Sequence, residues 1–209
     1  MKITLIVAIC VIVLWTIYGY FASRVEQAEY SVVDKKDSYE IRVYPKHLVA
    51  QASVSGNYTE SLNQGFSIVA GYIFGGNKKS QPIAMTAPVM IGNTSESQNI
   101  AMTVPVTTSG TNLNRTISFV MPKEYSLESL PVPTDPRVKI VEVPEQRFAV
   151  LRYSGWRSNS LTEKQGKKLL QLLENDGVSM VSKDYTYAGY NAPFTPPWMT
   201  RQEVMIEIK

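Results

Sequence analysis

Residues 39–44 read YEIRVY, and residues 48–54 read LVAQASV. Apolar and polar side chains alternate through both segments, which are also rich in β-branched and aromatic residues. Because successive side chains of a strand point to opposite faces of a sheet, this alternation predicts strands with one buried face. The segment from Tyr30 to Val54 therefore begins a sheet.

Two helix signals interrupt the strand-like segments. Asn57 is followed three residues later by Glu60, the spacing of a capping box, and apolar residues then recur at helical intervals. This pattern predicts a helix over about 58–74 that ends at a pair of glycines. A serine and a glutamate with the same spacing, followed by a leucine-rich segment, predict a second helix over about 160–176.

The remaining strand-like runs lie on both sides of the second helix. They are 81–91, 99–107, 115–121, 137–153, 185–190 and 203–208. The order is strands, helix, strands, and then the same again, with connections short enough for hairpins. This order predicts an α+β fold with two similar halves of an antiparallel sheet, each carrying one helix, in preference to a parallel βαβ fold.

The N-terminal segment has the properties of a membrane span. Residues 3–22 read ITLIVAICVIVLWTIYGYFA and contain no charged residue. Twenty helical residues at about 1.5 Å each cross the roughly 30 Å of a bilayer core. A cleaved signal peptide is the alternative, but no small-residue cleavage site follows cleanly. We therefore expect an anchor and linker over 1–28, one domain over 29–209, and a single-pass protein. Lys2 and the amino terminus favour a cytoplasmic N-terminus, whereas Arg24, Lys35 and Lys36 favour the opposite orientation. Of the two orientations, we expect the one with the domain on the non-cytoplasmic side.

The composition excludes several classes of function. A formal net charge of +3 with scattered Lys and Arg residues gives no basic surface for nucleic acid. Cys10, the only cysteine, lies in the apolar segment, so no disulfide and no Cys-rich metal site can form within the chain. His47 is the only histidine and has no nucleophile motif nearby, so neither a His-pair metal site nor a catalytic triad is expected.

Five motifs of the domain are distinctive: SYEIRVYP near residue 40, IAMTAPV at 83–89, YSGW around Gly155, AGYNAPFTPP at 188–197, and RQEVMIEI at 201–208. Together they resemble the motifs of the SOUL haem-binding family. The resemblance covers nearly all of residues 29–209 in order and spacing. It implies a distorted antiparallel β-barrel of two pseudo-repeats with two external helices, here preceded by one transmembrane helix. It also implies non-covalent binding of haem or another tetrapyrrole in a shallow apolar groove.

The resemblance locates that groove between the first helix and the loop that joins the last two strands. In this chain the helix supplies Phe66, Ala70 and Phe74, and the loop 191–200 supplies Phe194, Trp198 and Met199, together with Pro193 and other prolines. Aromatic and proline-rich segments suit a flat macrocycle. The alternative is that Phe66 is a core residue and that the loop only covers one end of the fold.

The chain departs from the family at the iron ligand. Some relatives have a histidine where Val43 stands, whereas here the histidine is His47, so no metal ligand is carried over. A macrocycle of roughly 40 heavy atoms at about 0.3 kcal/mol per atom gains up to about 12 kcal/mol, more than the roughly 8 kcal/mol of micromolar binding. Apolar capture is therefore sufficient without an iron bond, and we expect His47→Ala to change haem affinity less than about threefold.

The sequence supports a binding protein for haem buffering, transfer or sensing at a membrane, with no catalytic residue of its own. An enzyme that removes the metal of a tetrapyrrole is one alternative, with Glu60, Asp184 or Glu203 as the acid. A binding module for other amphipathic or cationic small molecules is the second alternative, and it depends on fold analogy alone.

Overall fold

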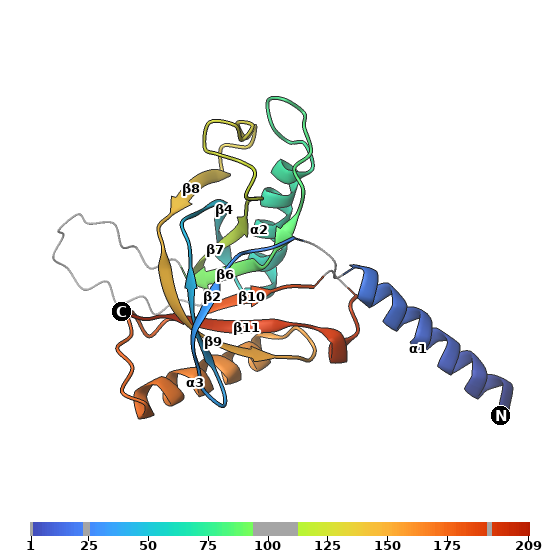
Figure 1. Cartoon of the computed structure of the whole chain (residues 1–209). Helices are drawn as coiled ribbons and strands as arrows, with labels where there is room; N and C mark the ends of the chain where they lie inside the picture. Colours follow the sequence, from blue (N-terminus) through green and yellow to red (C-terminus); the bar gives the residue numbers. More distant parts are fainter. Residues whose placement is uncertain (1, 23–25, 94–112, 192–193) are drawn as a thin grey trace.

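The structure, a computed structural model, describes residues 2–22, 26–93, 113–191 and 194–209 (Figure 1). The helices are α1 (Lys2–Ala22), α2 (Tyr58–Ile73), α3 (Asn159–Asn175) and the short 3-10 helix η1 (Pro197–Met199). The strands are β1 (Glu26–Gln27), β2 (Ser31–Lys35), β3 (Glu40–Tyr44), β4 (His47–Gly56), β5 (Thr86–Ala87), β6 (Val89–Asn93), β7 (Leu113–Val120), β8 (Lys139–Val143), β9 (Gln146–Tyr153), β10 (Thr186–Gly189) and β11 (Gln202–Glu207).

Nine of these strands form one antiparallel sheet, in the order β2-β3-β9-β11-β10-β6-β7-β4-β8. Strands β1 and β5 form a separate parallel pair. The predicted α+β class with an antiparallel sheet is therefore confirmed. Among the described residues β2 and β8 are the two edges of the sheet and no ladder joins them, so the sheet is open there and a closed barrel is not confirmed.

The sheet has two halves with the same order of strands, and the halves meet where β6 pairs with β10. In the first half β4 leads into α2 and pairs with β7, which also pairs with β6. In the second half β9 leads into α3 and pairs with β11, which also pairs with β10. Strand β3, which precedes β4 in the sequence, pairs with β9 of the second half. Strand β8, which precedes β9, pairs with β4 of the first half. These two strands are therefore exchanged between the halves. Two pseudo-repeats would have this order, and the repeat itself stays a prediction.

The two long helices of the domain share one hydrophobic core with the sheet. Helix α2 packs on β4 and β7, and α3 packs on β9 and β11. The core side chains without measurable exposure are Ala50, Val69, Ile73, Ile117, Phe119, Ala149, Leu169, Leu173, Val204 and Ile206. A smaller cluster lies on the other face of the sheet and contains Tyr44, Ala87, Val150, Ala188, Tyr190 and Met205. The period-two alternation of β11 explains the division, since Val204 and Ile206 face the helices while Met205 faces away.

The helix starts follow side-chain caps. The Asn57 side chain accepts a hydrogen bond from the Glu60 amide at 3.0 Å, and the Glu60 carboxylate accepts one from the Asn57 amide at 3.4 Å, so the predicted capping box is confirmed. For α3 the prediction is displaced. The cap is Ser158, whose hydroxyl accepts from the Leu161 amide at 3.1 Å, and not the serine at 160.

Proline decides where two of the predicted strands are interrupted. The run expected at 137–153 is two strands, β8 and β9, which are separated at Pro144, a residue without an N–H for the ladder. The run expected at 81–91 gives strands only from Thr86 onward, and the Ala87–Pro88 peptide between β5 and β6 is cis. The strand expected at 99–107 lies outside the described residues.

Two buried tyrosines predict how stability depends on alkaline pH. The Tyr39 hydroxyl donates to the Asp176 carboxylate at 2.6 Å, and the Tyr72 hydroxyl donates to the Pro131 carbonyl at 2.8 Å. Burial raises the pKa of each phenol to about 12, and the Asp176 hydrogen bond contributes for Tyr39. Their contribution to stability is therefore complete below pH 10, and above it the unfolded chain loses these protons first. We expect the free energy of unfolding to fall between about pH 10 and 12, by up to roughly 1.4 kcal/mol per unit for each phenol.

Urea unfolding of the full chain at several pH values from 8 to 12 measures this slope. The matched control is the Tyr39→Phe and Tyr72→Phe double variant, which keeps both rings and removes both phenols. An unchanged slope in the double variant would assign the alkaline loss to other groups.

Candidate functional site

The three site residues predicted on α2 have different environments. Phe66 is partly buried and its ring packs on Phe119, with ring centroids 5.3 Å apart. Ala70 is buried. Phe74, at the C-terminal end of α2, has 68% of its surface exposed. Phe66 and Ala70 therefore belong mainly to the scaffold, and Phe74 is the residue of the three that a ligand can reach.

The three site residues predicted on the loop lie beside α1. The Trp15 indole N–H donates to the Phe194 carbonyl at 2.6 Å, and the rings of Trp15 and Trp198 meet edge to face with centroids 5.3 Å apart. Phe194 is 85% exposed, Trp198 is 55% exposed and Met199 is partly buried. Pro193 of the same loop lies outside the described residues.

The structure does not join these two groups in one cavity that we can describe. A cavity beside α2 is lined by Ser67, Ile68, Gly71, Tyr72, Gly76, Thr134, Asp135 and Arg137. A cavity beside the loop is lined by Trp15, Gly155, Trp156, Arg157, Phe194, Thr195, Pro197 and Thr200. The two cavities have no residue in common, so the groove between α2 and the loop stays a prediction.

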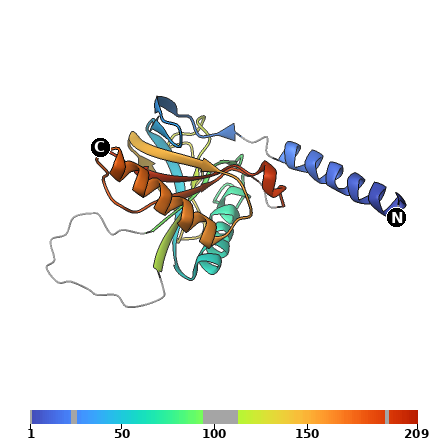
Figure 2. The same cartoon turned by 90° about the horizontal axis from the view of Figure 1, so that it is seen from below.

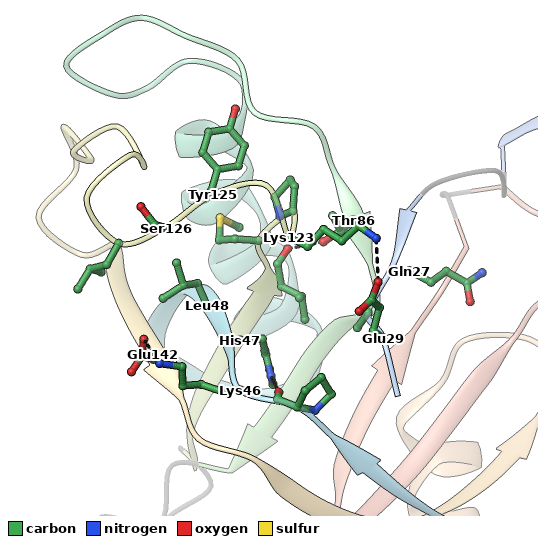
Figure 3. A pocket seen from close by; sticks show the side chains of 16 residues that line it. Gln27, Glu29, Lys46, His47, Leu48, Thr86, Lys123, Tyr125, Ser126 and Glu142 are labelled. Atoms are coloured by element: carbon green, nitrogen blue, oxygen red, sulfur yellow. Dashed lines mark hydrogen bonds and ion pairs between the residues drawn. The ribbon is translucent and has the colours of Figure 1, made fainter. Parts of the chain in front are cut away.

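A third cavity, of about 340 Å³, surrounds the turn between β3 and β4 (Figure 3). It is formed by segments that are distant in the sequence: 27–29, 45–48, Thr86, 120–127 and Glu142. Its apolar wall consists of Pro45, Leu48, Val120, Met121, Pro122, Tyr125 and Leu127. Such a wall suits an apolar ligand.

The imidazole of His47 lines this cavity. Its Nδ1 lies 2.8 Å from the Pro45 carbonyl oxygen. A carbonyl oxygen can only accept, so Nδ1 carries the hydrogen and Nε2 of the neutral ring keeps its lone pair. Nε2 makes no hydrogen bond or ion pair with the described residues. A histidine that ligates a metal commonly donates its other N–H to a backbone carbonyl in this way, which fixes the ring.

Two lysines of the cavity form ion pairs at the surface of the protein. Lys123 Nζ lies 2.9 Å from a Glu29 carboxylate oxygen, the ion pair drawn in Figure 3, and Lys46 Nζ lies 3.2 Å from a Glu142 carboxylate oxygen. All four side chains are more than half exposed, and exposed pairs of this kind contribute at most about 1 kcal/mol. Either lysine can therefore exchange its partner for the carboxylate of a ligand.

His47 also lines a fourth cavity, of about 310 Å³, which lies on the sheet face that the helices do not cover. The apolar and aromatic side chains around this fourth cavity are Tyr44, Val49, Met90, Val143, Phe148, Tyr185 and Met205. Asp184, one of the acids considered above, lines it as well and is exposed. The imidazole thus stands between two cavities.

The buried carboxylate of Glu203 is not available to a ligand. The side chain has no exposed surface. One oxygen accepts from Arg201 at 2.8 Å, and the other accepts from Arg42 at 2.9 Å and from the Tyr190 hydroxyl at 2.7 Å. Burial and the Glu203 charge raise the pKa of Tyr190 above its usual range, so this phenol stays a donor. Glu60, the third acid, is occupied in the capping box of α2.

The comparisons with known proteins decide the family. The profile of the SOUL heme-binding protein family matches residues 25–207. The chain belongs to the SOUL haem-binding family. Heme-binding protein 2 of Homo sapiens is 31% identical over 157 residues, which cover 75% of this chain and 71% of the relative. The name of that relative describes a binding protein.

Similarity to solved structures supports only the fold of this SOUL protein. The C-terminal domain of EcmrR superposes with a TM-score of 0.59 at 9% identity, covering 86% of this chain and 98% of that domain. A protein described as a hydrolase from Listeria innocua superposes with a TM-score of 0.52 at 12% identity, covering 83% of this chain and 93% of that one. Identities this low carry no activity from one protein to another.

Proposed function

We propose that this SOUL protein binds haem or a related tetrapyrrole non-covalently and without converting it, for haem buffering, transfer or sensing at a membrane. The observation that carries the proposal is the His47 cavity, where an apolar wall, an imidazole nitrogen with a free lone pair and two exchangeable lysines meet. A tetrapyrrole has an apolar ring and carboxylate side chains, and a haem iron accepts an imidazole nitrogen. Each of these features has a counterpart at the cavity.

The size of the cavity sets how the macrocycle is held. About 340 Å³ lies near the lower end of the range for small-molecule sites, which is roughly 300–1,000 Å³. A macrocycle of roughly 40 heavy atoms is therefore expected to insert one edge and to leave the rest exposed. Partial burial suits a carrier that must release its ligand.

The predicted groove is the alternative location. Phe74, Phe194 and Trp198 are exposed aromatic residues that a porphyrin could cover. The other predicted residues, Phe66, Ala70 and Met199, are buried or partly buried. The sequence alone favours this wall and a dispensable His47. The geometry around His47 favours the opposite assignment, and the two locations predict different mutant phenotypes.

Hemin and iron-free protoporphyrin titrations of the full chain in detergent distinguish the locations. If His47 ligates iron, His47→Ala weakens hemin binding at least ten-fold and shifts the Soret band, while protoporphyrin binding changes less than threefold. Phe194→Asp then leaves both affinities unchanged, as does the charge control Thr59→Asp, which lies on the exposed surface of α2. A ten-fold loss of both ligands in Phe194→Asp, with His47→Ala unaffected, would move the site to the loop.

The membrane part of the proposal depends on α1. Among the described residues it is the one helix long and apolar enough to cross a bilayer. We propose that it anchors the chain through residues 3–22. The anchor and linker then cover 1–28, and the binding domain covers 29–209 on the non-cytoplasmic side. The domain has a two-repeat, barrel-like sheet, as the family resemblance implies.

The alternative of a cationic ligand is disfavoured at Glu203, because arginine and tyrosine donors occupy both of its carboxylate oxygens.

A further inference from the structure

Exposed aromatic side chains gather where α1 meets the domain. Trp156, Phe194 and Trp198 are 69%, 85% and 55% exposed. Trp156 and Phe194 line one cavity together with Trp15 of α1, and Trp198 packs on Trp15. We call these three domain residues the aromatic surface. Large apolar side chains exposed together on a domain mark an interaction site.

Helix α1 is packed on this surface and is more than a tether. Gly19 is buried, and a Cβ atom at this position would lie 2.7 Å from Cδ of Pro196. The absence of a side chain is therefore what permits the close approach. Trp15 stands one turn earlier on the helix and makes the hydrogen bond to the Phe194 carbonyl. Two contacts one turn apart hold the loop 194–199 along the side of the helix.

The position of Trp15 sets the depth of the loop. Trp15 precedes the last residue of α1, Ala22, by seven residues, which is about 10 Å along a helix. If residues 3–22 span the bilayer, a loop that contacts Trp15 lies at or below the level where the helix leaves the apolar core. Figures 1 and 2 agree with this arrangement, because α1 and the C-terminus lie on opposite sides of the domain in both views.

We propose that the aromatic surface inserts into the lipid interface beside α1, so that the domain rests on the bilayer. Tryptophan is enriched at this depth because its ring is apolar and its N–H is polar. The inference rests on the membrane span of the proposed function and on its assignment of the tetrapyrrole to the His47 cavity. It gives Phe194 and Trp198 a lipid partner in place of a macrocycle.

Site-directed fluorescence of the full chain in phosphatidylcholine vesicles tests the aromatic surface. Cys10→Ser removes the only cysteine, after which Phe194→Cys or Trp198→Cys carries an environment-sensitive nitrobenzoxadiazole label. The matched control is Val181→Cys, since Val181 is 54% exposed and its amide bonds to Glu207 near the C-terminus. We expect the labels at 194 and 198 to be quenched at least threefold more by lipids with a nitroxide high on the acyl chain than the label at 181.

Three further measurements keep the proposal separate from the proposed function. Resistance of the protein to carbonate extraction confirms the span, and extraction would overturn both the span and the aromatic surface. An integrated protein whose labels at 194 and 198 are as open to aqueous iodide as the label at 181 would overturn the surface alone. Gly19→Leu, which separates the loop from α1, is expected to return the label at 194 to water while the protein stays integrated.

Discussion

Replacement of Glu203 by glutamine is expected to lower the free energy of unfolding by about 3–5 kcal/mol. Glutamine has nearly the same shape, so the loss is that of a charge and not of volume. Arg42 is 3% exposed and Arg201 is largely buried, and both guanidinium groups lie within 2.9 Å of this carboxylate. Without it, two positive charges stay in a site from which water is excluded. Urea unfolding of the full chain in detergent, followed by far-ultraviolet circular dichroism, measures the change.

Glu40→Gln is the matched control for this prediction. Glu40 binds the same guanidinium of Arg42 at 2.8 Å, but its side chain is 27% exposed. Water can therefore compensate for part of the lost charge, and we expect a cost of about 1 kcal/mol. If the two variants lower the free energy of unfolding equally, the stabilisation by Glu203 does not come from its buried ion pairs.

Phe66→Ala is expected to destabilise the domain by about 3 kcal/mol, whereas Phe74→Ala changes its stability by less than about 0.5 kcal/mol. Both residues are phenylalanines at the same predicted site and on the same helix. Phe66 packs on the fully buried Phe119, so its truncation opens a cavity in the core, while Phe74 is 68% exposed. Thermal unfolding of the two variants side by side gives the comparison.

The same pair of variants also tests the predicted groove. If the groove binds the macrocycle, Phe74→Ala weakens hemin and protoporphyrin together in a fully folded protein. An unchanged affinity for both ligands would leave α2 with a structural role only.

Local signals in the sequence were sufficient for most of the fold. Both helices are found within a residue or two of the predicted ranges, although the cap of α3 is Ser158 and not the serine at 160. The cap of α2 was predictable because the Asn57 and Glu60 pair acts over three residues and needs no distant partner. Strand pairing is different. The exchange of β3 and β8 between the halves joins residues about one hundred positions apart, and alternation along each strand says nothing about its neighbour.

The candidate site was harder to predict for the same reason. His47 is visible in the sequence as the only histidine, but its cavity exists only because β4 pairs with β7 and brings 45–48 beside 120–127. The signal that could have drawn attention to it is the Pro45 carbonyl two residues before the imidazole, which fixes the tautomer within a tight turn. Phe66 stays a predicted site residue, and its contact with Phe119 could not be predicted, since an aromatic residue at helical spacing cannot reveal what lies opposite it.

The exchange of β3 and β8 has a consequence for biosynthesis. Val43 of β3 pairs with Arg147 of β9 in the finished sheet, so the ribosome must add about one hundred residues between the two partners. At 5–20 residues per second this takes roughly 5–20 s. During that interval α1 has already been synthesised and β3 has only β2 beside it. The N-terminal half therefore exposes an unpaired strand edge, which is open to aggregation, until β9 is synthesised. Truncated chains that end before residue 146 lack β9 and cannot complete the sheet.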